Sequence, residues 1–498
     1  MMENSEQQKA EGPQQLGRYF ENTPPTVFDE IVSHREVPEL DLEGINPLVG
    51  PSFLKSDFEM ERPSDLSVPD YHRDAWIPSD TTRKILLSIA TSPPGGSPPN
   101  RENLTMPGLT LQGDILDATR EASIHYYGED EHMHRNVLTA SDVTQDERGL
   151  RNLIQAGCYR AAVNLSGRLL GVYGQGFGKI DHPSKHTPHS LQLWYTRLSL
   201  LSKLRQVEVL KAEHQAFGNL DKPDMYFSFH PELYGTRHGS MASFSFRLLL
   251  AEIPSFCGCH RESLDKLYAI LGTVNHILEN LGQGLSEEGG KATCSPVERE
   301  DSVKLWSRRR SKIMISIVNC AVAARNFVLA IEVLEEISEF PNWQDEQLEI
   351  FKLALGRLHL FLGDIPAAEG KLLSKDTSRN TTSREWINRG LMAVTQNAFQ
   401  EAHDCFQVAL KQEPDNVMVV NNMSVCLLYT GKLQAAVCLL ENVVKKNPIR
   451  NLQEPIILNM STLYELNTTH CRQIKLQLLK QMNRYKGDAI DIQCLKLV

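Results

Sequence analysis

Residues 383–414, SREWINRGLMAVTQNAFQEAHDCFQVALKQEP, set the architecture, because their small and apolar side chains recur at a fixed interval in the flanking sequence. Three sets of residues repeat every 34 positions: Gly356, Gly390 and Ser424; Ala368, Ala402 and Ala436; Leu372, Phe406 and Leu440. Pro414 and Pro448 share this interval and lie where a second helix would end. A period of this length is typical of stacked helical hairpins.

Each repeated position has a physical role in such a hairpin. Gly390 and Ala402 are small where two antiparallel helices cross, since close approach leaves no room for a larger side chain. Phe406 fills the space between neighbouring hairpins. Gly363 and Gly431 suit the turn between the helices, where a positive φ costs glycine little. A single hairpin leaves an apolar face exposed, so the hairpins must stack into a superhelix.

This pattern resembles the tetratricopeptide repeat, with residues 383–414 as the closest match. Helical spacing of apolar residues continues elsewhere, and we find no convincing run of alternating strands. We therefore predict an all-α fold: an α-solenoid of tetratricopeptide-type hairpins, preceded by an extended acidic N-terminal arm. The expected divisions are an acidic, proline-rich leader (1–104), a helical region of divergent repeats (105–281), a flexible linker (282–300) and the repeat array (301–498). A generic helical bundle remains an alternative for residues 105–281.

The leader carries most of the net charge. Residues 1–80 hold 17 acidic and 6 basic residues, out of 62 and 52 in the whole chain. The body is therefore almost neutral and lacks the field that attracts phosphate backbones, so nucleic-acid binding is not expected. The leader contains isolated aromatic residues, such as Phe28, Phe58 and Trp76. It is either a flexible tail or an arm whose aromatics dock onto the body or onto a partner.

Composition and motifs argue against several other classes of protein. We find neither an apolar run long enough to cross a membrane nor a secretory signal, and the 10 irregularly spaced cysteines suggest reduced cytoplasmic thiols. Gly174–Lys179 lacks the first glycine and the final hydroxyl of a phosphate-binding loop. Cys257 and Cys259 have no second pair at zinc-site spacing. We expect no catalytic site, cofactor, metal or small-molecule substrate, and no membrane insertion.

The concave face of the solenoid is the candidate partner-binding groove, lined by the first helix of each hairpin. The candidate residues are Leu353, Arg357, Phe361, Ile387, Leu391, Asn421, Val425, Leu428 and Tyr429. A mostly apolar groove favours another helix or an extended apolar segment as its partner. Repeats that clamp a peptide carboxylate need lysines and asparagines, and here Asn388 and Asn422 stand beside Leu353 and Met418. The alternative is that these side chains face neighbouring helices as core.

The layout of the whole chain resembles the subunit 12 family (also called tetratricopeptide repeat protein 15) of the transport protein particle, TRAPP. The segments that carry the resemblance are VFDEIVSHREVPELDLEGINPLVGPSFLKSDF (27–58), DAWIPSDTTRKIL (74–86), LRNLIQAGCYRAAVNLSGRLL (150–170) and EWINRGLMAVTQNAFQEAHDCFQVALKQEPDN (385–416). The resemblance implies a non-catalytic scaffold subunit of TRAPP III, a tethering and Rab-activating complex of endoplasmic reticulum-to-Golgi transport and autophagy.

By the same resemblance, the partners are the large arm subunits 8, 11 and 13, and the chain reaches the core and the Rab GTPase only indirectly. Its location is cytoplasmic, at the periphery of the endoplasmic reticulum–Golgi intermediate compartment and the Golgi. The competing hypothesis is a free-standing peptide-binding adaptor, either a co-chaperone or a mitotic scaffold. A third hypothesis, an enzyme with an unrecognised site, requires activity in the purified chain alone.

Overall fold

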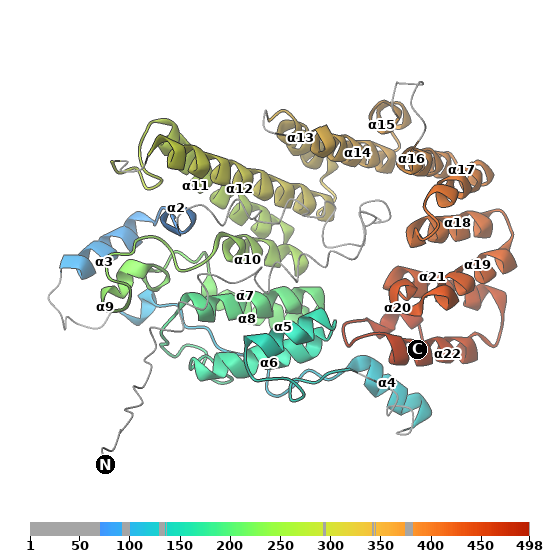
Figure 1. The fold of residues 1–498 in the computed structure, drawn as a ribbon, viewed down its shortest axis with the longest axis horizontal. Helices are drawn as coiled ribbons and strands as arrows, with labels where there is room; N and C mark the ends of the chain where they lie inside the picture. The colour runs from blue at the N-terminus through green and yellow to red at the C-terminus, as the bar shows by residue number, and fades with distance from the viewer. Residues whose placement is uncertain are drawn as a thin grey trace, which may run out of the picture.

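The computed structural model describes residues 70–91, 100–128, 135, 137–291, 295–340, 343, 345–373 and 382–497 (Figure 1). Within these ranges the β contacts are three isolated bridges, Leu109–Phe177, Tyr226–Ser240 and Leu285–Lys291. The α-helices are α2 (Asp70–Arg73), α3 (Asp80–Thr91), α4 (Ala118–Tyr127), α5 (Glu147–Gln155), α6 (Tyr159–Val172), α7 (Pro188–Lys203), α8 (Val207–His214), α9 (Pro231–Tyr234), α10 (Phe244–Phe256), α11 (His260–Gly282), α12 (Pro296–Ala323), α13 (Phe327–Ser338), α14 (Asp345–Leu362), α15 (Ile365–Leu372), α16 (Ser383–Thr395), α17 (Phe399–Gln412), α18 (Val417–Tyr429), α19 (Leu433–Lys446), α20 (Pro448–Asn451), α21 (Glu454–Asn467) and α22 (Cys471–Tyr485). The predicted all-α fold is confirmed.

The 34-residue period corresponds to three successive hairpins, α14–α15, α16–α17 and α18–α19. A Cβ atom placed on Gly390 would lie 2.5 Å from Cε1 of Phe406, which is fully buried. A Cβ atom on Gly356 would lie 2.5 Å from Cγ of Leu372. The small residues therefore lie at the helix crossings, as the sequence predicts, because a larger side chain would overlap its neighbour there.

The turn between the two helices places a left-handed residue at the same point of each of these hairpins. These residues are Gly363 (φ 80°), Asn397 (φ 60°) and Gly431 (φ 78°). Asparagine takes this conformation more readily than other non-glycine residues, so it replaces glycine in the middle hairpin. At the start of α18, the Asn416 side chain accepts a hydrogen bond from the amide of Val419 at 3.1 Å. This cap satisfies an amide that has no partner within the helix.

The predicted linker at 282–300 is shorter in the structure. Helix α12 begins at Pro296, where Ser295 and Glu298 form a reciprocal capping box. The long helices α11 and α12 then pack side by side as a hairpin. One hydrophobic core runs from Ala75 to Leu358 and includes residues on both sides of this connection. The two helical regions that the sequence seemed to separate therefore share their packing, because the apolar faces of α11 and α12 cover each other.

Residues 70–91, in the described part of the leader, are docked onto the body. Trp76 is 7% exposed, with the Arg247 guanidinium 4.4 Å from its ring centroid and the Trp306 ring at 6.4 Å. His72 is hydrogen-bonded to the buried carboxylate of Glu287. The docking-arm alternative is thus correct for this segment. Phe28, Phe58 and the rest of residues 1–69 lie outside the described residues.

The helices form two layers along the repeat array (Figure 1). Helices α14, α16 and α18 lie on the inner side of the curve, and α15, α17 and α19 lie outside them. The array then bends back, so that the segment after α22 meets α6 in the N-terminal helical region. The inner helices therefore face the interior of a ring.

Candidate functional site

The candidate surface is the inner side of α14, α16 and α18, which the first helix of each hairpin provides as expected (Figure 1). Three of its predicted residues are buried instead. Leu353 and Ile387 belong to hydrophobic cores between helices. Asn421 accepts a hydrogen bond from Nδ2 of Asn459 on α21 at 2.7 Å. For these three side chains the core alternative is correct, because the next hairpin covers them.

Four other candidates are partly exposed and can contribute to a surface: Arg357, Leu391, Val425 and Leu428. Leu391 packs against two neighbouring cores, and Leu428 packs against the core of the C-terminal hairpins. Val425 lies one helical turn before Tyr429, so the two share a face of α18. Leu391, Val425 and Leu428 therefore offer the edges of apolar side chains, and Arg357 adds a charged side chain.

The remaining two candidates, Phe361 and Tyr429, are exposed at 39% and 65%. Phe361 is the next-to-last residue of α14, and Tyr429 is the last residue of α18. Each contacts an aromatic residue of the preceding hairpin. The ring of Tyr429 stacks on that of Phe399, with centroids 4.5 Å apart and planes at 8°. The Phe361 and Phe327 centroids are 4.8 Å apart. These aromatic pairs hold large apolar surfaces open to solvent in fixed orientations, which suits a protein partner.

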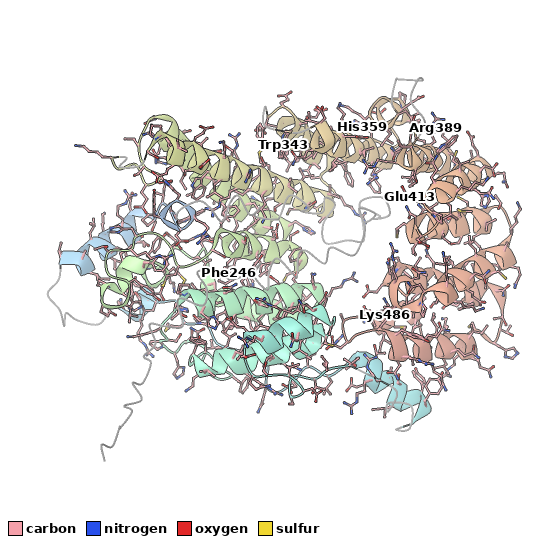
Figure 2. All side chains as sticks on the ribbon, viewed as in Figure 1. Phe246, Trp343, His359, Arg389, Glu413 and Lys486 are labelled. Carbon is pink, nitrogen blue, oxygen red and sulfur yellow. The ribbon has the colours of Figure 1, made fainter. Side chains whose placement is uncertain are left out.

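Arg389 on α16, labelled in Figure 2, is paired along its own helix. Its guanidinium lies 3.2 Å from the Glu385 carboxylate, one turn earlier, and 5.1 Å from the Trp386 ring centroid. Burial raises the pKa of the Cys426 thiol on α18 to about 11, so this thiol stays neutral at physiological pH. These helices therefore expose aromatic and apolar side chains together with the charged Arg357 and Arg389, and the Cys426 thiol is not an activated nucleophile.

The structure argues against a carboxylate clamp. Asn388 is 1% exposed, and its amide donates a hydrogen bond to the Leu372 carbonyl at 3.3 Å. A side chain that is buried and bonded in this way cannot reach a peptide terminus. Leu353, at a position where a clamp needs lysine, is also buried.

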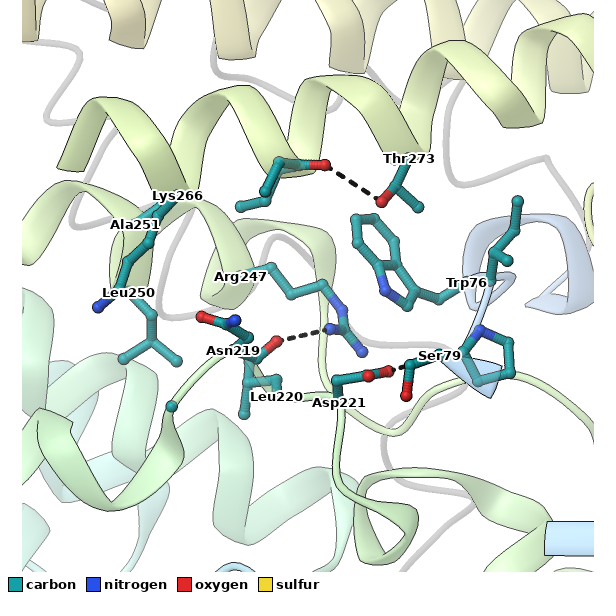
Figure 3. A pocket seen from close by; sticks show the side chains of 15 residues that line it. Trp76, Ser79, Asn219, Leu220, Asp221, Arg247, Leu250, Ala251, Lys266 and Thr273 are labelled. Atoms are coloured by element: carbon teal, nitrogen blue, oxygen red, sulfur yellow. Dashed lines mark hydrogen bonds between the residues drawn. The ribbon is translucent and has the colours of Figure 1, made fainter. Parts of the chain in front are cut away.

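A second hollow lies between the docked arm and helices α10 and α11 (Figure 3). It has a volume of about 340 Å³ and is lined by Trp76, Asp221, Arg247 and Lys266 among others. The Arg247 guanidinium already donates to the Asn219 carbonyl at 3.3 Å and to the Ser240 hydroxyl at 2.7 Å. The polar groups here bind one another, so the hollow belongs to the seam that anchors the arm.

The motifs with possible chemistry lie at helix ends and turns. Gly174–Lys179 follows the end of α6, Cys257–Cys259 forms the turn between α10 and α11, and His260 is the first residue of α11. Across the described residues, the structure brings together no group of three or more metal-ligating side chains. It also contains, over the same ranges, no helix long and apolar enough to cross a membrane.

Sequence reasoning missed one set of contacts, those that join the segment after α22 to Arg135 and to the start of α6. Asp488 accepts hydrogen bonds from the amides of Arg160 and Ala161. Arg135 donates to carbonyls of Asn483, Lys486 and Gly487. The residues concerned lie outside the repeats and more than 300 positions apart, so no local pattern in the sequence connects them.

The hairpins, their crossings and the curved inner face define an α-solenoid of the tetratricopeptide type, a class of protein that presents extended surfaces. The chain is 39% identical over 452 residues to trafficking protein particle complex subunit 12 of Mus musculus, and 38% identical over 451 residues to that of Homo sapiens. The resemblance to the TRAPP subunit 12 family is thereby confirmed.

These alignments cover 89% of this chain but 56% and 61% of the two relatives, so the chain spans less than two thirds of their length. No protein-family model matches the chain. Among solved structures, it aligns with the APC/C hetero-tetramer Cut9-Hcn1 at a TM-score of 0.29 and 11% identity, over 76% of this chain and 57% of that one.

Proposed function

We propose that the chain is a non-catalytic scaffold subunit of a TRAPP III-like complex, which tethers vesicles and activates a Rab GTPase. The observation that carries this proposal is the 39% identity to a TRAPP complex subunit across 452 residues. In this role the chain bridges the large arm subunits 8, 11 and 13, and it reaches the core subunits and the GTPase through them. It works in endoplasmic reticulum-to-Golgi transport and autophagy, as a peripheral protein on the cytoplasmic side of these membranes.

The inner face of α14, α16 and α18 supports a bridging role. Its exposed aromatics, Phe361 and Tyr429, are held by ring contacts, so a partner that covers them does not have to order them first. A stable interface of ordinary size buries about 1,600 Å² in total. Apolar edges on three successive hairpins give a helix of the partner a continuous line of contact.

A charge-insertion experiment tests this surface. In the paired variant Val425→Glu and Tyr429→Glu, two carboxylates would stand on the inner face of α18, and an apolar partner would have to desolvate them. The matched control is Tyr268→Glu on α11, where the tyrosine is 43% exposed. Tagged full-length chains are expressed in cells, and the native particles are separated by size. We expect the control to co-elute with other TRAPP subunits and the paired variant to elute largely free.

The size of the native wild-type particle decides between the two functions considered from the sequence. A constitutive subunit elutes with a large complex, whereas a free-standing adaptor elutes mostly alone. Elution of the wild-type chain alone would overturn the scaffold proposal. Residue-level crosslinking of the large particle then identifies the subunits that contact the inner face.

A further inference from the structure

The segment that follows α22 is bound to the start of α6 by its acidic residue. Asp488 is 2% exposed. One carboxylate oxygen accepts from the Arg160 amide at 3.0 Å, and the other accepts from the Ala161 amide at 2.9 Å. Nε of Arg160 donates to the Asp488 carbonyl at 2.9 Å. A carboxylate on the first amides of a helix satisfies donors that have no partner within it and complements its dipole. Asp488 thus caps a helix more than 300 residues away.

A buried arginine ties the same segment to the residues before α5. The Arg135 side chain is 3% exposed and is paired with Asp117, the residue that caps α4. It donates to the carbonyls of Asn483 at 3.0 Å, Lys486 at 3.3 Å and Gly487 at 3.2 Å. Guanidinium groups hold several acceptors in one plane, so Arg135 fixes the course of the backbone after α22.

The backbones themselves are in close contact at this joint. A Cβ atom on Gly487 would lie 2.4 Å from the Gly157 carbonyl oxygen, so glycine is required for the approach. Ala489 packs against the core of the N-terminal hairpins, and its neighbour Ile490 is buried in the core of the C-terminal hairpins. Residues 486–490 therefore lie between two separate cores and are held mainly by polar and backbone contacts. Beside them, α4 packs Ala122, Tyr126 and Tyr127 on the core of the C-terminal hairpins. Lys486 marks its position in Figure 2.

We propose that residues 486–490 form a C-terminal latch, which closes the helical hairpins into a ring at α6 and can open while the hairpins on both sides stay folded. The hairpins are held by their own apolar cores, whereas the latch is held by hydrogen bonds that water can replace when it opens. Helix α4 packs on the C-terminal core and stays with α22 when the latch opens. The closed latch fixes the curvature of the inner face. When the latch opens, the two ends separate and the inner face becomes less curved. This inference does not depend on the proposed function.

Two variants open the latch by different chemistry. Asp488→Ala removes the acceptor of two amides, and Gly487→Ala places a methyl group against the Gly157 carbonyl. The control is Asp415→Ala, which removes an acid from an exposed ion pair with Lys446 in the same array. We measure small-angle X-ray scattering, hydrogen exchange and helix content on the full chain.

We expect both latch variants to increase the radius of gyration and to exchange the Arg160 and Ala161 amides at least about tenfold faster, because a hydrogen bond to a charged group is lost or weakened. Exchange within α14–α19 and the helix content should match those of the control. Scattering and exchange equal to the control in both variants would overturn the proposal. Loss of helix content in both variants would also overturn it, since the joint would then be inseparable from the hairpins.

Discussion

Replacing Gly390 with alanine tests whether the helix crossings determine the stability of the array. The new methyl group would lie 2.5 Å from Cε1 of Phe406 and 2.8 Å from Cδ1 and Cζ. Phe406 is fully buried in a core with Ile387 and Ala402, so its ring has little room to move. Overpacking of this kind costs about 1–3 kcal/mol. The higher helix propensity of alanine offsets part of this cost, because it stabilises the folded chain by about 1 kcal/mol relative to glycine.

The matched control is Gly272→Ala, which makes the same change inside α11, where an added Cβ meets no atom within 4 Å. The control isolates helix propensity and is expected to stabilise the chain by about 1 kcal/mol. The Gly390 variant should therefore be less stable than the control by about 1–3 kcal/mol. Urea unfolding followed by circular dichroism gives the two midpoints and slopes.

Equal stabilisation by the two substitutions would refute the reasoning, because it would show that the crossing accommodates a methyl group. A double variant, Gly390→Ala with Phe406→Leu, adds a further check. Leucine removes the ring atoms that the methyl group would meet. In the Phe406→Leu background, replacing Gly390 with alanine should cost less than it does in the wild-type background.

Further predictions concern the core, the arm and pH. Ala402 is fully buried, so Ala402→Arg should collapse the array by burying a charge at the helix crossing, and unchanged thermal melting would contradict this. Trp76→Ala should lower the free energy of unfolding, measured in urea, by about 3–5 kcal/mol. A deletion of residues 1–80 would remove Trp76 and should therefore impair folding as well as binding. Burial lowers the pKa of His186 to about 4, so between pH 6.5 and 4 the unfolded chain takes up a proton first, and this histidine by itself lowers stability by roughly 3 kcal/mol. Asp224, 3.8 Å away, has its pKa raised by burial to about 6 and opposes this loss in the wild type, so the His186→Gln variant should lose less stability than the wild type between pH 6.5 and 4 in urea unfolding.

The fold was predictable because the repeat period is a local property of the chain. Gly390, Ala402 and Phe406 contact one another within a single hairpin, so their spacing alone specifies the crossing. The left-handed turn at Asn397 escaped notice because asparagine takes that conformation without the signature of glycine. The linker was predicted to be too long because residues 282–300 are mostly polar. The structure shortens it because α11 and α12 pack on each other through apolar residues on either side of this segment.

The candidate surface was only partly predictable. Helical periodicity shows which residues share a face of α18, but not how far the next hairpin covers that face. Asn421 is buried because Asn459 of α21 lies against it, and Tyr429 is exposed because it lies at the end of its helix. The contacts of Asp488 and Arg135 depend on the total curvature of the array, which sums small rotations over every hairpin.

An open solenoid can lengthen or shorten during evolution by whole units, since each unit touches only its neighbours. A chain in which Asp488, just after α22, caps α6 at Arg160 and Ala161 has no such freedom. Duplicating one hairpin would carry Asp488 away from its helix, and deleting one would make the two ends collide. Orthologues should therefore conserve the number of hairpins between α6 and α22 and accumulate length differences in the connecting loops.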